Sequence, residues 1–349
     1  MKSLPYNTFW QRIHKSAKKN SFPLRVMFEL TYRCNFHCKH CYVPQSYRNY
    51  NELKTKEVLS ILNQLKDIGC FYLGFTGGEP FIREDIIDIL WYAKKLGFEI
   101  IIYTNGSLIN EEIARELQRL RPNKIDITIP AMTETAFERI SGMPGSRDKV
   151  FGAIDLLYKN GVNLGFKTCV LKENESEIKD IQDFAASLGA LHRLDDMFSP
   201  RLDGSKEPYR YRGRLSNNAN IRESKANFRE FISDNSCAIS ENSRLFKCGV
   251  GVSQAAITSL GELKMCLMID YPKYKILSEV RGQRSDLKDA WKRLKELVVS
   301  IQPNKNYQCN TCKLQPYCKW CPAMGWLYNR SFTSCEPESR RWAEKCSNL

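Results

Sequence analysis

Three cysteines lie close together early in the chain, at Cys34, Cys38 and Cys41, with three and then two residues between them. Thiolate sulfur binds zinc and iron–sulfur clusters. A cubane cluster needs a thiolate on each iron that it anchors, and this segment offers only three, so one iron would stay open to a substrate or cofactor. A zinc site completed by His37 or His40 is the alternative. The spacing favours iron and leaves zinc open.

A second group of cysteines lies near the C-terminus: nine of the 14 cysteines fall between Cys237 and Cys346. In a reducing compartment such a density indicates metal binding rather than disulfides. A zinc ribbon built on two C-x2-C pairs is the alternative, but it needs only four thiolates. The isolated Cys70 and Cys169 adjoin apolar, strand-like sequence, and we expect them to be small buried side chains.

The elements that position these residues form a repeating α/β pattern. Six strands are predicted at 25–31, 71–75, 99–103, 124–129, 163–171 and 191–198, with helices at about 53–68, 82–96, 110–120, 147–160 and 175–188. Six parallel strands with helical crossovers indicate an α/β fold, a partial (β/α)6 barrel. The three cysteines follow the first strand, Thr76–Pro80 the second and Thr104–Gly106 the third. Chemistry is therefore expected at the carboxyl ends of the strands.

The composition is that of a folded, soluble chain. Hydrophobic residues make up 42% of the 349 residues, and we find no secretory signal and no apolar run long enough to span a membrane, so we expect a cytoplasmic protein. The net charge is +14, and the first 24 residues contain no acidic side chain. A basic surface suits nucleic acid, an acidic peptide or an acidic electron-transfer partner, but it is also a common solvated surface.

The C-x3-C-x2-C loop after the first strand, followed by Gly77-Gly78-Glu79-Pro80 after the second, resembles the radical S-adenosylmethionine (SAM) superfamily. The resemblance implies that Cys34, Cys38 and Cys41 hold a 4Fe-4S cluster whose open iron binds SAM, which is cleaved to a 5′-deoxyadenosyl radical. It also implies these cofactor contacts: Gly77, Gly78 and Glu79 at the methionyl amine, His40 near the adenine, and Asn105 and Thr128 elsewhere along SAM. For Asn105, a plain turn residue is the alternative.

The C-terminal cysteines resemble the SPASM extension, which houses one or two auxiliary 4Fe-4S clusters. One cluster would use Cys309, Cys312, Cys318 and Cys335, and the other would use Cys248, Cys266 and Cys321, with Cys237 as candidate fourth ligand. The last spacing, two residues before Cys321, departs from the more usual three. The expected organisation is a basic extension at 1–24, the partial barrel at 25–200, a linker with a bridging helix at 201–236 and the auxiliary-cluster domain at 237–349.

Enzymes that combine these two units mostly modify peptides or proteins, so the resemblance implies a peptide maturase that installs a crosslink or a similar change. The tract Pro200–Ser205 is similar to one in several such maturases. Its Arg201 and Asp203, with Arg210, Arg212 and Arg214, either bind substrate or form a solvated loop. The short N-terminal extension suggests that a separate protein, or the barrel face itself, binds the leader peptide. The cluster chemistry implies flavodoxin or ferredoxin as electron donor.

Two alternatives belong to other classes. Some relatives act on tetrapyrroles in haem synthesis, which would predict tight binding of a porphyrin. A metal-stapled protein that binds nucleic acid through its basic surface would show salt-sensitive affinity and no turnover of SAM. The sequence has no nucleic-acid motif beyond its charge, so we rank that reading last.

Overall fold

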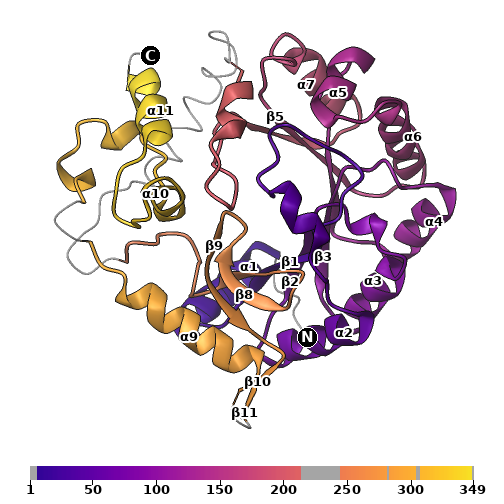
Figure 1. Cartoon of the computed structure of the whole chain (residues 1–349). Helices are drawn as coiled ribbons and strands as arrows, with labels where there is room; N and C mark the ends of the chain where they lie inside the picture. The colour runs from indigo at the N-terminus through magenta and orange to yellow at the C-terminus, as the bar shows by residue number, and fades with distance from the viewer. Residues whose placement is uncertain (1–5, 214–243, 281–282, 304–306, 348–349) are drawn as a thin grey trace.

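A sheet of nine strands, in the order β6-β5-β4-β3-β2-β1-β7-β8-β9, runs through the computed structural model (Figure 1). The structure describes residues 6–213, 244–280, 283–303 and 307–347. Six parallel strands follow one another in chain order: β1 (Arg25–Thr31), β2 (Tyr72–Gly77), β3 (Glu99–Thr104), β4 (Lys124–Thr128), β5 (Leu164–Cys169) and β6 (Leu191–Asp195). This arrangement confirms the predicted α/β class and partial (β/α)6 barrel, and each strand overlaps its predicted run.

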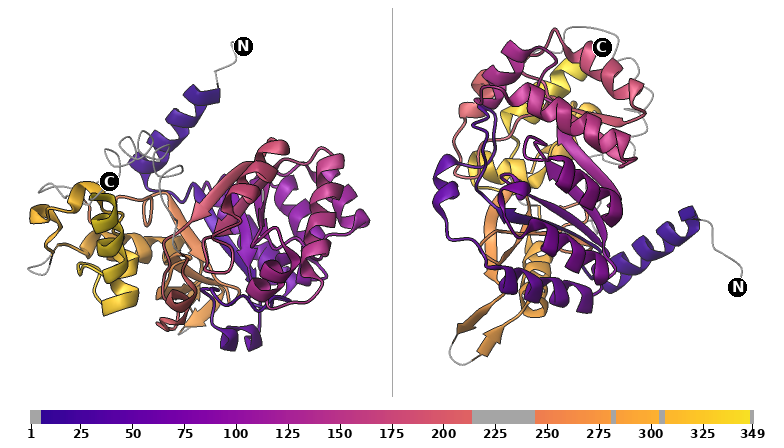
Figure 2. Two further views of the ribbon diagram at one scale, coloured as in Figure 1. Left: turned by 90° about the horizontal axis from the view of Figure 1, so that it is seen from above. Right: turned by 90° about the vertical axis from the view of Figure 1, so that its right-hand side faces the viewer.

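The helices that connect these strands cover the outer face of the sheet (Figure 1). They are α2 (Thr55–Asp67), α3 (Ile86–Lys95), α4 (Glu111–Leu120), α6 (Ser146–Lys159) and α7 (Ile178–Ser187). Two further helices were not predicted: α1 (Tyr6–Asn20), which extends away from the body (Figure 2), and the short α5 (Glu134–Ser141). Among the described helices, none is both long enough and apolar enough to pass through a bilayer.

Strand β1 shows how the two faces of the sheet differ. Successive side chains of a strand point to opposite faces. Val26, Phe28 and Leu30 are at most 1% exposed and belong to the main apolar core. The alternate residue Glu29 points to the inner face instead, where its carboxylate meets the ammonium of Lys264 at 2.8 Å. One face of β1 therefore packs in the core, and the other carries charge.

Ion pairs recur along the inner face of the barrel. Lys124 and Asp126 on β4 lie 3.0 Å apart, and Lys167 on β5 lies 3.0 Å from Asp195 on β6. The side chains of these four residues are partly accessible. The filled interior of a complete barrel is dominated by apolar branched side chains. This polar inner face is instead suited to a charged or polar ligand.

The C-terminal part of the chain extends the same sheet. Strand β7 (Gln254–Ile257) pairs in parallel with β1, and β8 (Glu262–Cys266) and β9 (Ile269–Lys275) continue from it as antiparallel strands. The remaining elements are the hairpin β10 (Ser278–Val280) and β11 (Gln283–Ser285), then α9 (Leu287–Ser300), α10 (Pro322–Asn329) and α11 (Pro337–Ser347). One sheet therefore contains strands from both of our expected domains, 25–200 and 237–349. The expected linker at 201–236 is described only as far as residue 213.

A buried charge cluster joins these two parts. Lys264 on β8 and Glu29 on β1 are both fully buried, and the Lys264 ammonium also meets Asp270 at 3.0 Å. Glu29 accepts hydrogen bonds from the hydroxyls of Tyr32 at 2.9 Å and Tyr42 at 3.1 Å. Burial alone would lower the pKa of Lys264, but Glu29 and Asp270 raise it above its ordinary value. The lysine is therefore charged, and each charge in the cluster depends on the others.

Substitution of Lys264 by methionine is expected to destabilise the fold by about 3–5 kcal/mol, because it leaves the buried Glu29 carboxylate without its counter-charge. The double variant Glu29→Gln/Lys264→Met removes both charges, and we expect it to recover at least half of that loss. Urea unfolding of the three proteins measures both effects. Equal stability of wild type and Lys264→Met would contradict this interpretation.

Candidate active site

The three N-terminal cysteines lie on the loop that leaves β1. The Cys41 N–H donates to the Cys38 carbonyl at 3.2 Å, and the Phe36 N–H donates to the Cys34 sulfur at 3.4 Å. Burial raises the pKa of the Cys34 thiol to about 11 and raises those of Cys38 and Cys41 as well. Each thiol lies near enough to another for an ionised neighbour to raise its pKa further, so ligation of a metal would displace their protons.

Within the ranges that the structure describes, no three His, Cys, Asp or Glu side chains converge on a position for one metal ion. That finding concerns single ions. In a 4Fe-4S cluster each cysteine would bind a different iron, so the three sulfurs need not meet at one point.

The turn after β2 packs directly on the start of this loop. The Gly78 N–H donates to the Thr31 carbonyl at 2.7 Å, and the Glu79 N–H donates to the Arg33 carbonyl at 2.9 Å. A Cβ atom on Gly77 or Gly78 would lie 2.1 Å from a backbone oxygen of that segment, and Gly77 has a φ of +134°. Glycine is therefore required here to let two backbones approach each other.

Alanine at position 78 is expected to destabilise the protein by about 3 kcal/mol or more and to lower its iron content, because the loop must move to admit the new Cβ. Gly152→Ala is the matched control. Gly152 lies within α6, and a Cβ there would meet no atom within 4 Å, so this change should stabilise the helix by about 0.5–1 kcal/mol. Urea unfolding and iron analysis check both, and unchanged stability of Gly78→Ala would contradict the close packing.

Glu79 connects the turn after β2 to the turn after β3. Its buried carboxylate accepts hydrogen bonds from the Thr104 hydroxyl at 2.7 Å, the Asn105 N–H at 2.7 Å and the Phe81 N–H at 3.1 Å. Burial raises the pKa of Glu79 to about 7, against the opposing effect of these donors. The Glu79 carboxylate thus links the turn after β2 to the turn after β3. Its contact with the methionyl amine stays a prediction.

Asn105 lies beside the cysteine loop. Its Nδ2 donates to Asn35 Oδ1 at 2.9 Å and is 3.9 Å from the Cys34 sulfur, while its Oδ1 accepts from the Ser107 N–H at 2.9 Å. It is therefore a turn residue and a neighbour of a predicted cluster ligand at once. Thr128 ends β4 and is partly exposed. Its contact with SAM stays a prediction.

His40 has a buried ring nitrogen that needs a partner. Its Nδ1 has no hydrogen-bond partner in the described part of the chain, and burial lowers the pKa of the imidazole to about 4. A neutral ring with an unsatisfied nitrogen beside three thiols fits a site that a bound group completes. The residues present therefore fit a cluster and an organic cofactor.

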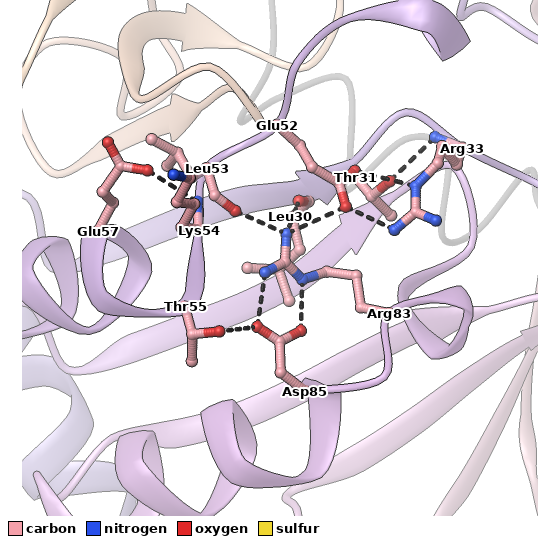
Figure 3. Close-up of polar contacts among 10 residues, drawn as sticks. All are labelled: Leu30, Thr31, Arg33, Glu52, Leu53, Lys54, Thr55, Glu57, Arg83 and Asp85. Atoms are coloured by element: carbon pink, nitrogen blue, oxygen red, sulfur yellow. Dashed lines mark hydrogen bonds and ion pairs between the residues drawn. The ribbon is translucent and has the colours of Figure 1, made fainter.

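A polar network around Arg83 links the end of β1 to the segment at Glu52 and Leu53 (Figure 3). The Arg83 guanidinium, 5% exposed, donates to the carbonyls of Leu30 at 3.2 Å and Leu53 at 3.0 Å and binds both carboxylate oxygens of Asp85 at 2.7 and 2.9 Å. Glu52 lies 3.4 Å from Arg83 and 2.6 Å from Arg33, the residue before the first cysteine. The sequence analysis missed Arg83, although it directly follows the Gly-Gly-Glu-Pro turn and its two apolar residues.

Five of the described C-terminal cysteines lie near one another in the structure, three in one place and two in another. Ionised Cys321 and Cys248 both raise the pKa of Cys266, which burial raises to about 12, so these three thiols are neighbours. Cys312 is likewise a neighbour of Cys335. Cys309 begins the 3-10 segment Cys309–Thr311, and Cys318 directly follows the segment Gln315–Tyr317. Cys237 lies outside the described residues. The ligand sets themselves stay predictions.

The two isolated cysteines differ. Cys70 is buried, as expected. Cys169 is only partly buried and ends β5 next to the first cysteine loop, where an ionised Cys41 would raise its pKa. Cys169 is thus buried in part, and it packs against the main apolar core.

The tract after β6 contacts the protein through some of its side chains, whereas Asp203 and Arg210 are exposed. Arg201 donates to the carbonyls of Lys39 and Cys41, both at 3.3 Å, and Arg212 pairs with Glu338 on α11 at 2.5 Å. The Asp203 carboxylate accepts the Ser205 N–H at 2.9 Å within its own turn. Of our candidate substrate residues here, Arg201 and Arg212 are thus engaged in the fold, and Arg214 lies outside the described residues.

Comparison with known proteins finds a family model that matches part of the chain. The model of the radical SAM superfamily matches residues 28–185, which hold the cysteine loop, the glycine turn and strands β2 to β5. The matched segment, 45% of the chain, is similar to the radical SAM domain. Enzymes of this superfamily use a 4Fe-4S cluster and SAM.

Curated relatives include the Fe-coproporphyrin III synthase of Methanosarcina barkeri, 30% identical over 159 residues, 45% of this chain and 40% of that protein. The antilisterial bacteriocin subtilosin biosynthesis protein AlbA of Bacillus subtilis is 24% identical over 327 residues, 90% of this chain and 71% of AlbA. For several curated relatives, the chain spans about half of their length or less.

Solved radical SAM structures share the fold. SuiB of Streptococcus suis, bound to its precursor peptide SuiA, superimposes with a TM-score of 0.68 at 18% identity. The match covers 97% of this chain and 82% of SuiB. The likeness therefore extends beyond the radical SAM domain to the cysteine-rich C-terminal part.

Proposed function

We propose that this protein is a cytoplasmic radical SAM enzyme that modifies a peptide or protein. Cys34, Cys38 and Cys41 would hold the cluster that binds SAM. When bound, the cluster supplies the electron that cleaves SAM to a 5′-deoxyadenosyl radical, which removes a hydrogen atom from the substrate. The residues of this chain position the cofactors and exclude water, and the polar inner face of the barrel receives the substrate.

The observation that carries the peptide substrate is the extent of the matches. AlbA, a bacteriocin biosynthesis protein, matches 90% of the chain, and the peptide-bound structure of SuiB covers 97% of it. Both matches extend far beyond residues 28–185, into the C-terminal part of the chain. A peptide maturase therefore accounts for both parts of the chain, and a crosslink or similar change in the peptide is the expected product.

The tetrapyrrole alternative has its own support. The Fe-coproporphyrin III synthase is more similar in sequence, at 30% identity, but its match covers only 45% of this chain. A match over less than half of the chain indicates shared radical chemistry more strongly than it indicates a shared substrate. We therefore rank tetrapyrrole modification second.

Auxiliary clusters complete the proposal. Cys248, Cys266 and Cys321 would hold one cluster, and Cys309, Cys312, Cys318 and Cys335 the other, which agrees with the proximities seen among the described thiols. The contacts of Gly77, Gly78, Glu79, His40, Asn105 and Thr128 with SAM belong to the same proposal. Flavodoxin or ferredoxin would donate the electron, and a separate protein would present the leader peptide.

The substrate is tested by comparing peptides with a porphyrin. Peptides encoded by short reading frames beside the gene are synthesised and incubated anaerobically with the iron-loaded enzyme, SAM and dithionite. We expect a change in the mass of one peptide, coupled to 5′-deoxyadenosine formation. Consumption of iron-coproporphyrin III with no peptide modified would overturn the peptide proposal in favour of the tetrapyrrole one.

A further inference from the structure

Two arginines that are distant from each other in the sequence donate hydrogen bonds to the backbone of the first cysteine loop. Arg48, on a 3-10 segment at Gln45–Asn49, donates to the carbonyls of Cys34 at 3.1 Å and Phe36 at 2.6 Å. Arg201, after β6, donates to the carbonyls of Lys39 and Cys41, both at 3.3 Å. One guanidinium thus holds the first half of the loop and the other holds the second half.

The planar, permanently charged guanidinium suits this task, since it offers several donors in a fixed geometry. The loop needs such donors because its carbonyls belong to no helix or sheet. The backbone of the Arg201 tract adds another contact, from the Leu202 N–H to the Tyr42 carbonyl at 3.0 Å. The loop is therefore held on two sides before any cofactor binds.

Both arginines also place positive charge beside the cysteines. The Arg48 guanidinium contacts the carbonyl of Cys34 and the Arg201 guanidinium contacts that of Cys41, so each charge lies on the backbone of a predicted cluster ligand. Neither charge is free of other partners. Arg48 meets His37 Nδ1 at 3.1 Å, and Arg201 pairs with the half-exposed Glu207 at 2.5 Å.

Other charges near the loop are matched by opposite ones. Lys39 lies 3.6 Å from Glu173, and Arg33 pairs with Glu52 at 2.6 Å. Arg33 stands directly before Cys34, yet the structure gives it no contact with a loop carbonyl, and its side chain is 47% exposed. Arg33 is therefore a matched control for Arg48 and Arg201.

We propose that Arg48 and Arg201 are positioning residues that set the reduction potential of the first cluster, raising it through their positive charge. Reduction adds a negative charge to the cluster, and a nearby cation stabilises the reduced form more than the oxidised one. Glu207 opposes Arg201 in this respect, since it partly neutralises its charge. The inference rests on the proposed function, because it needs the cluster on Cys34, Cys38 and Cys41.

The test is a redox titration of the iron-loaded full chain, followed by EPR. The first cluster is identified by the part of the spectrum that changes when SAM is added. We expect Arg48→Gln and Arg201→Gln to shift its midpoint to more negative values. Arg48→Lys and Arg201→Lys keep the charge and should stay near wild type, and Arg33→Gln should shift the midpoint less than either glutamine variant, because Arg33 contacts no carbonyl of the loop.

Glu207→Gln should shift the midpoint potential of the first cluster in the opposite direction. It leaves both arginines in place and removes the charge that opposes Arg201, so the midpoint should shift to a more positive value. This variant keeps the proposal testable if an arginine variant fails to fold. The proposal is overturned if Glu207→Gln leaves the midpoint unchanged or lowers it, or if the lysine variants shift as far as the glutamine variants.

The titration also separates this inference from the proposed function. A wild-type protein whose spectrum does not respond to SAM contradicts the proposed function itself. A wild-type protein that responds to SAM, with variants whose midpoints do not move, contradicts only the role of the two arginines.

Discussion

Cys38→Ala is expected to abolish the formation of 5′-deoxyadenosine from SAM. The variant keeps two of the three thiolates on the loop after β1, which is too few to hold a cubane with one open iron. We expect the loss of about four irons per chain, since one whole cluster depends on this loop. Iron analysis and chromatography of the reaction products measure the two effects.

The matched control for this variant is Cys70→Ala. Cys70 is buried against β1 and β2, with its thiol 3.5 Å from the Tyr72 carbonyl, and it lies away from the loop in the fold. This variant should keep its full iron content and its activity. Formation of 5′-deoxyadenosine by Cys38→Ala at the wild-type rate would contradict the assigned ligand set.

Cys266→Ala and Cys312→Ala are expected to remove two different auxiliary clusters. Cys266 neighbours Cys248 and Cys321, whereas Cys312 neighbours Cys335. Each variant should lose about four irons per chain, and the double variant about eight, because each cysteine belongs to a separate cubane. Both single variants should still form 5′-deoxyadenosine, since the first cluster stays intact, but they should not form the modified peptide.

The double variant decides between one auxiliary cluster and two. If it loses no more iron than either single variant, the C-terminal cysteines hold one shared cluster, and the two ligand sets are wrong. Zinc in place of iron in the wild-type protein would instead support the zinc-ribbon alternative for this region.

The barrel could be predicted from the sequence because its strands and helices repeat in a regular order. The run at 25–31 coincides with β1, and the other five strands lie within a few residues of their predictions. The α1 helix was missed, since its lysines and polar residues look like a charged extension, although Ala17 packs with Leu24 and Tyr72. Strand β7 was missed because only its pairing with β1, distant in sequence, makes it part of the sheet.

The site was predictable only where a motif marks it. The cysteine spacing and the glycine turn are short local patterns, and the structure brings both to the carboxyl ends of β1 and β2. Arg48 and Arg201 carry no such signal. Both side chains act on backbone carbonyls of the cysteine loop. Cys41 is 160 residues from Arg201 in the sequence, and only the folded chain brings these two residues together.

The most direct test of the central claim is formation of 5′-deoxyadenosine by the wild-type protein. The chain is loaded with iron and sulfide under anaerobic conditions and is then reduced with dithionite in the presence of SAM. The radical SAM assignment predicts 5′-deoxyadenosine, and an EPR spectrum of the reduced cluster that changes when SAM is added. A protein with its full iron content that forms none, and whose spectrum ignores SAM, would contradict the account.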